Sequence, residues 1–133
     1  MPFRILIADD DLHTRRILET LLAREPSLQG PEIVGAADGE EALAALDRFT
    51  PDLVITDLLM PRMDGFELVA ALRAPALVSS GGHDTTCPAP TIRSVFDRIQ
   101  TAKSLFHDPD LTHTTSAAFY SMTWSWLDRF LHP

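Results

Sequence analysis

Residues 51–66 read PDLVITDLLMPRMDGF, and this stretch decides how the chain is interpreted. Leu53–Thr56 is a short apolar run after Pro51, which is typical of a strand buried on both faces, and it stops at the acid Asp57. A turn follows, and good helix formers then predict a helix over Gly65–Arg73. The stretch therefore predicts a buried strand whose carboxyl end carries a carboxylate.

The amino-terminal residues repeat this arrangement. Phe3–Ala8 is a continuous apolar run that ends at Asp9, Asp10 and Asp11, and apolar residues then recur at helical spacing as far as Pro26. Asp11 is the expected N-cap of that helix. Further strands are expected at Glu32–Ala36, Ala76–Ser79 and Ser104–His107, and further helices at Gly39–Phe49, around Ile92–Ile99 and at Ser116–Leu131.

Strands that alternate with helices favour a parallel sheet, because parallel neighbours need crossover connections, and these are right-handed. We therefore expect an α/β fold with a doubly wound, five-stranded parallel sheet and helices on both faces. In such sheets, ligands bind beyond the carboxyl ends of the strands, where the strand order reverses. Asp9, Asp10 and Asp57 all follow strand ends of this kind.

Composition excludes several classes of protein. The chain has 133 residues, 45% apolar and 23% charged, which suits a single globular domain over residues 1–133 that needs no disulfide. No apolar run is long enough to span a bilayer and the start does not resemble a signal peptide, so we expect a cytoplasmic protein without a membrane partner. The net charge of −8 repels phosphodiester backbones, which argues against direct binding of nucleic acid.

Carboxylates gathered at one sheet edge repel one another unless protons or a cation neutralise them. Asp9, Asp10 and Asp57 therefore predict a site for a divalent ion. Mg²⁺ suits this site best, because it takes hard oxygen ligands and bridges carboxylates to phosphate oxygens. Asp10 and Asp57 are the expected side-chain ligands, with Asp9 in support, whereas for Asp11 the capping role is the favoured interpretation.

The segment Pro51–Phe66 resembles the phosphoacceptor region of receiver domains in bacterial two-component response regulators. That family has an apolar strand, an acceptor Asp, two variable residues, Met-Pro and a turn with Asp-Gly. The stretch ILIADDDLHTRRIL resembles the family's acidic pair after strand one, and the resemblance covers residues 3–73. It implies a stand-alone, chemotaxis-type receiver with the flavodoxin-like strand order 2-1-3-4-5. The matching residues are Asp57, Leu58, Leu59, Met60, Pro61, Asp64 and Gly65, with Asp9 and Asp10 as the pair.

The resemblance also implies a mechanism. The Asp57 carboxylate attacks phosphorus and forms an acyl phosphate, and the donor is a phosphohistidine of a sensor histidine kinase or a histidine phosphotransfer protein. Mg²⁺ would take the backbone carbonyl of Leu59 as its third protein ligand. The new charge then changes a surface that contacts a downstream protein, so the chain is expected to signal and not to act as an enzyme. Leu59 cannot orient an attacking water, which predicts slow hydrolysis of the phosphoryl group.

Receivers read the phosphoryl group with a Ser or Thr after strand four and a Lys after strand five. The stretch ALVSSGG at 76–82 resembles strand four, and we assign the hydroxyl to Ser80, with Ser79 as the competitor and a turn serine as the plain alternative. The family's Lys-Pro pair is missing. Lys103 is the only lysine in the chain and the candidate for this role, with His107 as the alternative, pH-dependent donor. The chain is thus atypical from about residue 80.

The last expected helix carries two apolar stripes. One stripe can face the sheet, and the other could serve a partner or a homodimer through this C-terminal face, although a wide core face is an equal alternative. The stripes are Phe119, Met122, Trp126 and Phe130, and Tyr120, Trp124, Leu127 and Leu131.

Two other functions compete with the phosphoacceptor hypothesis. In the first, the chain is a degenerate receiver that docks a partner regardless of phosphorylation, and the missing Lys-Pro favours this hypothesis. In the second, it is a haloacid-dehalogenase-type phosphatase, because Asp9 and Asp11 have the spacing of that family's two acids. That family also needs a downstream lysine and a later acidic pair. The phosphatase hypothesis also leaves the motif from Asp57 to Gly65 unexplained.

Overall fold

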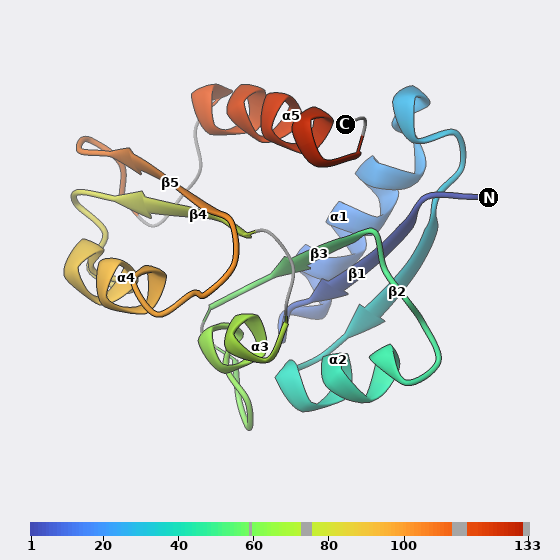
Figure 1. Cartoon of the computed structure of the whole chain (residues 1–133), viewed down its shortest axis with the longest axis horizontal. Coiled ribbons are helices and arrows are strands. Elements are labelled where there is room, and N and C mark those ends of the chain that lie inside the picture. The colour runs from blue at the N-terminus through green and yellow to red at the C-terminus, as the bar shows by residue number, and fades with distance from the viewer. Residues whose placement is uncertain (59, 73–75, 113–116, 132–133) are drawn as a thin grey trace. The chain divides into compact units, whose positions relative to one another are not determined.

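The structure is a computed structural model that describes residues 1–58, 60–72, 76–112 and 117–131 (Figure 1). It divides into two compact units, a first unit, Met1–Ala71, and a second unit, Leu72–Pro133. Across the described ranges, no helix has both the length and the apolar character needed to cross a membrane.

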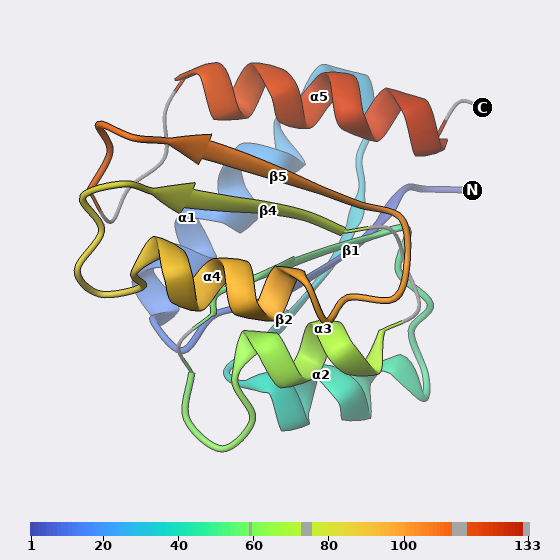
Figure 2. The same ribbon diagram turned by 60° about the vertical axis from the view of Figure 1, so that its left-hand side comes forward.

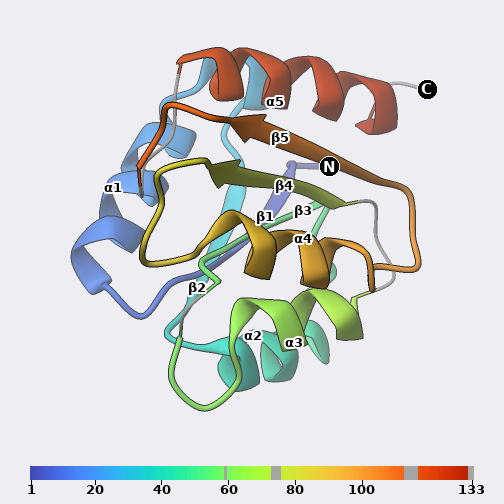
Figure 3. The ribbon, with the colours of Figure 1, turned by 90° about the vertical axis from the view of Figure 1, so that its left-hand side faces the viewer.

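The first unit is a three-stranded parallel sheet in the order β2-β1-β3. Because the chain crosses from β1 to β2 and then back past β1 to β3, right-handed connections place α1 and α2 on opposite faces of the sheet. Figure 3 shows α1 on one side of this sheet and α2 with α3 on the other. The elements are β1 (Arg4–Ala8), α1 (Leu12–Ala23), a short 3-10 turn (Pro26–Leu28), β2 (Glu32–Ala36), α2 (Gly39–Leu46), β3 (Leu53–Thr56) and α3 (Gly65–Ala71).

The core of the first unit is centred on β1, the middle strand. Ile5, Leu6 and Ile7 are fully buried, as expected for a strand that is covered on both faces. Ala42 of α2 and Leu68 of α3 are also fully buried, so one face of each of these helices completes the core.

The second unit holds a parallel pair of strands, β4 and β5, and Figure 2 shows this pair between α4 and α5. Ile92 of α4 and Leu127 of α5 are buried, and the indole of Trp126 donates a hydrogen bond to Ser104 Oγ at 3.1 Å. These contacts attach each helix to the strands. The elements are β4 (Ala76–Gly81), α4 (Ala89–Phe96), β5 (Lys103–Asp108) and α5 (Ala117–Leu131).

Parallel strands joined by helical crossovers confirm the predicted α/β class. The order within each sheet, β2-β1-β3 and β4-β5, agrees with the predicted order 2-1-3-4-5. The five strands form two sheets, and within the described ranges no hydrogen-bonded ladder joins β3 to β4. The single domain over residues 1–133 therefore stays a prediction.

Two element boundaries differ clearly from the sequence analysis. The fourth strand continues beyond Ser79 to Gly81, because Ser80 and Gly81 pair with β5, and only then does the Gly- and Pro-rich loop begin. The second helix ends at Leu46 and not at Phe49. After Leu46 the chain forms a tighter turn, in which Asp47 N donates to Ala44 O at 3.3 Å. Arg73 and Ser116, the expected ends of two helices, lie outside the described residues.

The last helix does not present one of its predicted stripes as a uniform surface. Leu127 is buried whereas Trp124 is 44% exposed, although both belong to the same predicted stripe. The homodimer through this face stays a prediction. The side chains of Phe119, Tyr120, Phe130 and Leu131 lie outside the described part of the structure.

Candidate metal centre

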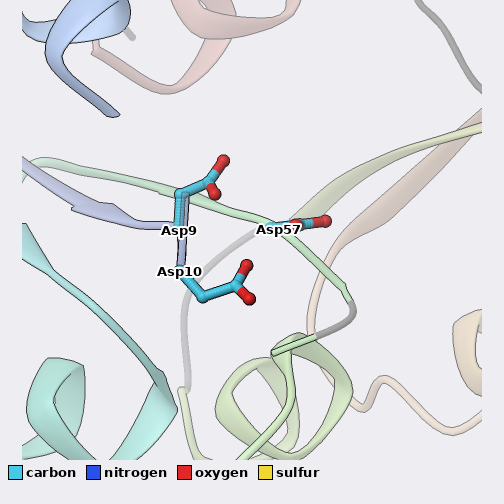
Figure 4. Close-up of side chains that lie close together, drawn as sticks. All are labelled: Asp9, Asp10 and Asp57. Atoms are coloured by element: carbon cyan, nitrogen blue, oxygen red, sulfur yellow. The ribbon is translucent and has the colours of Figure 1, made fainter. Parts of the chain in front are cut away.

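Three carboxylates meet where β1 and β3 end. Asp9 and Asp10 follow β1, Asp57 follows β3, and one oxygen from each lies within 4.8 Å of the others (Figure 4). The two strands are hydrogen-bonded neighbours with Ala8 opposite Thr56, so the residues that follow them must be adjacent. Asp9 is buried, Asp57 is half-buried and Asp10 is exposed, so the cluster opens to solvent on one side.

Backbone hydrogen bonds fix the positions of these acids. Asp9 N donates to Ala36 O at 3.0 Å and Asp57 N donates to Ala8 O at 2.9 Å, which extends both ladders of the sheet by one residue. One oxygen of the Asp57 carboxylate, Oδ1, accepts from Leu58 N at 2.7 Å. Asp9 and Asp57 therefore continue the hydrogen bonding of the strands that precede them.

The cluster carries uncompensated negative charge. Burial raises the pKa of Asp9, and the neighbouring carboxylates of Asp57 and Asp10 raise it further, against the hydrogen bond that Asp9 accepts from Asp11 N. No ion pair between described residues involves the three carboxylates. Close carboxylate oxygens without a protein cation are the donor set that a hard divalent ion prefers. The residues present therefore fit Mg²⁺, which Asp10 and Asp57 would hold with Asp9 in support.

Asp11 does not join this cluster. Its side chain accepts from His13 N at 3.1 Å and from Thr14 Oγ1 at 2.7 Å, which lowers its pKa and confirms its predicted role as the N-cap of α1. This role occupies the second acid that a dehalogenase-type phosphatase would need, so the structure gives that alternative no support. Leu59, whose carbonyl was the predicted third ligand, lies outside the described residues.

A glycine closes the segment that follows the acceptor candidate. Gly65 N donates to Leu58 O at 3.0 Å, and a Cβ atom at Gly65 would lie 2.0 Å from Asp57 O. Only glycine fits at this approach of α3 to the end of β3. Asp64, the preceding residue, accepts from Glu67 N at 2.9 Å and so caps α3. The Asp-Gly pair of the motif therefore has a structural function beside the site.

The proposed switch hydroxyl lies in the second unit. Ser80 is buried on β4, and its Oγ is 2.8 Å from Nδ1 of His107, the residue opposite it on β5. The structure therefore places His107 next to Ser80, the position that sequence analysis gave it as the alternative to Lys103. For the competitor Ser79, only the backbone is described, and it lies in β4.

Lys103 does not lie beside Ser80. It is the first residue of β5, so in a parallel pair it lies at the amino ends of the strands, whereas Ser80 and His107 lie near the carboxyl ends. Its ammonium donates to Phe96 O at 2.8 Å and to Asp97 O at 3.2 Å, at the end of α4. The assignment of Lys103 as the switch lysine is therefore not supported, because the strand begins at this residue and does not end before it.

Sequence analysis missed one pair of residues, Asp38 and Arg62, which joins α2 to the segment between β3 and α3. Asp38 is the N-cap of α2, and the spacing Asp38 to Glu41 could have indicated this role, since an acceptor followed three residues later by Glu is a helix-start signature. Nothing in the local sequence pairs it with Arg62, which is 24 residues away.

The sequence family described as the response regulator receiver domain matches residues 5–81. The chain belongs to this family. As a receiver domain of two-component systems, it is a signalling domain, and the carboxylates of Asp9, Asp10 and Asp57 lie inside the matched range. The match ends at Gly81, close to the residue where sequence analysis expected the chain to become atypical.

Curated relatives are longer proteins. A probable transcriptional regulator ycf27 from Porphyridium aerugineum is 47% identical to this chain over 70 residues. The match covers 53% of this chain and 28% of that protein. A protein-glutamate methylesterase/protein-glutamine glutaminase from Geobacter metallireducens is 41% identical to this chain over 99 residues. The match covers 69% of this chain and 27% of that protein. The chain thus spans less than a third of the length of these relatives.

Solved structures show the same fold. The chemotaxis protein CheY4 of Vibrio cholerae is 24% identical and matches with a TM-score of 0.65 over 96% of this chain and 99% of that one. A CheY-like receiver domain protein from Methanospirillum hungatei is 19% identical and matches with a TM-score of 0.66 over 99% of this chain and 98% of that one. The flavodoxin-like fold predicted from the sequence is therefore confirmed.

Proposed function

We propose that Asp57 is the phosphoacceptor of this receiver and that Mg²⁺ binds at Asp10 and Asp57, with Asp9 in support. The observation that carries this proposal is the approach of the three carboxylates to within 4.8 Å at the carboxyl ends of β1 and β3, in a chain of the receiver family. When bound, Mg²⁺ would neutralise negative charge on the phosphoryl oxygens.

Asp57 performs the chemical step. Leu58 N–H holds Oδ1 of its carboxylate, which fixes the orientation of the group and leaves Oδ2 as the nucleophile. Oδ2 forms a bond to phosphorus while the bond from phosphorus to the imidazole nitrogen of a phosphohistidine breaks, and the imidazole leaves with that electron pair. Asp57 thus becomes an acyl phosphate, and the donor returns to a free histidine.

The proposed partners follow from this chemistry. A sensor histidine kinase or a histidine phosphotransfer protein supplies the phosphoryl group, in the cytoplasm, and a downstream protein reads the changed surface. The methylesterase and the transcriptional regulator among the relatives each contain a region similar to this chain within a much longer protein. The function proposed here is therefore that of a signalling domain that promotes its own phosphorylation and dephosphorylation.

The response in the second unit is proposed to involve Ser80 with His107 as its partner. The 2.8 Å contact between Ser80 Oγ and His107 Nδ1 supports this pair, and the position of Lys103 at the opposite ends of the strands argues against the lysine. A hydroxyl donates readily to a phosphoryl oxygen, whereas a histidine does so best when it is protonated.

Intact mass spectrometry tests the acceptor. The native protein is incubated with acetyl phosphate and Mg²⁺, beside Asp57→Asn and the matched control Asp47→Asn, which changes an exposed acid at the end of α2. We expect one added phosphoryl group on the native protein and on Asp47→Asn, none on Asp57→Asn, and none without Mg²⁺.

A phosphorylation-independent docking module is the second candidate function. The observation that favours it is that the only lysine of the chain lies at the amino end of β5, away from Ser80. In that case, a folded native protein gains no phosphoryl group in the same experiment, and it binds its partner equally well before and after Asp57→Asn.

A further inference from the structure

An ion pair between the buried carboxylate of Asp38 and the largely exposed side chain of Arg62 connects the start of α2 to the segment between β3 and α3. Asp38 is only 1% exposed, and its two oxygens are both engaged. Oδ1 accepts from Glu41 N at 2.8 Å, and Oδ2 accepts from Nε of Arg62 at 2.6 Å and also from its Nη2. A buried carboxylate needs such partners, and Arg supplies a planar donor fork that suits it.

Arg62 has a left-handed backbone, with φ of 65°. A side chain larger than glycine or asparagine rarely adopts this conformation unless its surroundings hold it there. The next residue, Met63, is also tied to α2, since its carbonyl accepts from Gly39 N at 2.9 Å. Two adjacent residues of the loop are therefore fixed to the start of α2.

The same loop begins at the acceptor candidate. Leu58 N donates to the Asp57 carboxylate, and Leu58 O accepts from Gly65 N at 3.0 Å, which closes the two ends of the loop upon each other. Leu58 is joined to Gly65, and Arg62 and Met63 are held to α2, so the described residues of this loop depend on the contact with α2.

Capping alone does not explain the arginine. Asp11 and Asp64 cap α1 and α3 with hydrogen bonds from backbone N–H groups and a hydroxyl, and neither forms an ion pair with a described residue. Asp38 also caps its helix through Glu41 N, so the contact with Arg62 adds something that capping does not require. What it adds is a link between α2 and the acceptor loop.

We propose that Arg62 and Asp38 are positioning residues, whose ion pair holds Arg62 against α2 and so helps to keep Leu58 N–H where it orients the Asp57 carboxylate for the divalent ion. The inference rests on the proposed function for the phosphoryl step, but its effect on metal binding can be measured without a phosphodonor. Partners that orient metal ligands typically change the affinity about tenfold or more when they are removed.

The test compares Arg62→Asn, Arg62→Lys and the native protein by calorimetric titration with Mg²⁺. Asparagine tolerates the left-handed backbone, so Arg62→Asn removes the guanidinium without adding strain. We expect the Kd for Mg²⁺ to rise about tenfold in Arg62→Asn, and Arg62→Lys, which keeps the charge, to restore part of the loss. The matched control Arg93→Asn removes an exposed arginine of the second unit and is expected to leave the Kd unchanged.

The sign of the change separates positioning from simple electrostatics. Removing a positive charge from the first unit would by itself lower, and not raise, the Kd for Mg²⁺. A Kd that is lowered or unchanged in folded Arg62→Asn, with native phosphorylation intact, overturns the inference and leaves the proposed function standing. If Arg62→Asn does not fold, Arg62→Lys provides the test: it keeps the charge but loses the paired contact of Nε and Nη2 with Asp38 Oδ2, and this loss alone must raise the Kd. A native protein that binds no Mg²⁺ and gains no phosphoryl group overturns the proposed function itself.

Phosphorylation kinetics give the second readout. A misplaced loop should raise the Mg²⁺ concentration needed for half-maximal phosphorylation by acetyl phosphate, by the same factor as the Kd. The rate at saturating Mg²⁺ should change less. Equal Mg²⁺ dependence in the native protein and in Arg62→Asn would contradict a positioning role.

Discussion

Asp9 and Asp38 are two buried carboxylates of the first unit whose pKa values are shifted in opposite directions. Burial and the neighbouring acids raise the pKa of Asp9. The hydrogen bond from Glu41 N lowers the pKa of Asp38, with a further contribution from Arg62. Asp9 is therefore ionised at a cost to the fold, whereas ionised Asp38 stabilises it, and the two residues predict opposite responses to pH.

Replacement of Asp9 by Asn should stabilise the metal-free protein at pH 7. Because the folded pKa of Asp9 is raised, the folded state binds protons more readily than the unfolded state, and its stability falls as pH rises through that pKa. Asn keeps an oxygen that can accept from Asp11 N. We expect a higher urea midpoint for Asp9→Asn at pH 7 without Mg²⁺, and a smaller difference near pH 4. A lower urea midpoint for Asp9→Asn at pH 7 would show that ionised Asp9 does not destabilise the folded protein.

Added Mg²⁺ should reverse this order. Ligand that binds only the folded state stabilises it by about 2.7 kcal/mol at a concentration of 100 times the Kd. The native protein should gain this stabilisation, and Asp9→Asn should gain less. Urea titrations at several Mg²⁺ concentrations measure both, and an equal gain in the two proteins would remove Asp9 from the site.

Replacement of Asp38 by Asn should have the opposite pH dependence. The folded pKa of Asp38 is lowered below 3.8, so its contribution to stability is present above this pH and is lost as pH falls through the folded value. Asn is itself a good N-cap, so the substitution removes chiefly the charge. We expect Asp38→Asn to have a lower urea midpoint than the native protein at pH 7 and a smaller difference at pH 3. A difference that is independent of pH would show that packing, and not charge, is responsible.

At the scale of elements, the join between β3 and α3 is the least tolerant position. A Cβ at Gly65 would lie 2.0 Å from Asp57 O and 2.8 Å from Leu58 Cα, both of which are backbone atoms that cannot turn away. We expect Gly65→Ala to lower the free energy of unfolding by about 3 kcal/mol, the upper range for overpacking. Gly35→Ala is the matched control, because its new Cβ would meet the Glu19 and Arg15 side chains, which can move. Equal urea midpoints for the two variants would contradict this account.

The elements that sequence patterns predicted well are those with strong local signals. Phe3–Ala8 and Leu53–Thr56 are apolar runs that stop at acids, and parallel pairing then brings Asp9, Asp10 and Asp57 together without further information. Lys103 was assigned the lysine role because it is the only lysine of the chain and its sequence separation from Ser80 suits the family, although it precedes the strand predicted at Ser104–His107. The structure places it at the first position of β5, away from Ser80.

Long-range pairs were the other limit of the sequence analysis. The contact between Asp38 and Arg62 joins residues 24 positions apart, and the contact between Ser80 and His107 joins residues 27 positions apart. Neither pair has a local spacing that predicts it. The second contact also depends on the fourth strand continuing to Gly81, whereas Ser79-Ser80-Gly81 has the composition of a loop.

At the scale of the whole molecule, the chemistry and the proposed response belong to different units. The three carboxylates lie in Met1–Ala71, whereas Ser80, His107 and both tryptophans of the chain lie in Leu72–Pro133. The proposed Mg²⁺ would engage only carboxylates of the first unit. A phosphoryl group that is read by Ser80 must also alter the hydrogen bonding of the second unit.

Hydrogen exchange followed by mass spectrometry can separate these two effects. We expect Mg²⁺ alone to raise protection in peptides that contain the ends of β1 and β3, and to leave β4 and β5 unchanged. Acetyl phosphate with Mg²⁺ should additionally change exchange in the peptides of β4 and β5, since Ser80 then exchanges His107 for a phosphoryl oxygen. Asp57→Asn removes the acceptor and one proposed Mg²⁺ ligand, so it should lose this second change and weaken the first. If phosphorylation occurs at Asp57 but the exchange of β4 and β5 stays as in Asp57→Asn, the second unit does not read the phosphoryl group through Ser80, and its surface is the constant one that a docking module presents.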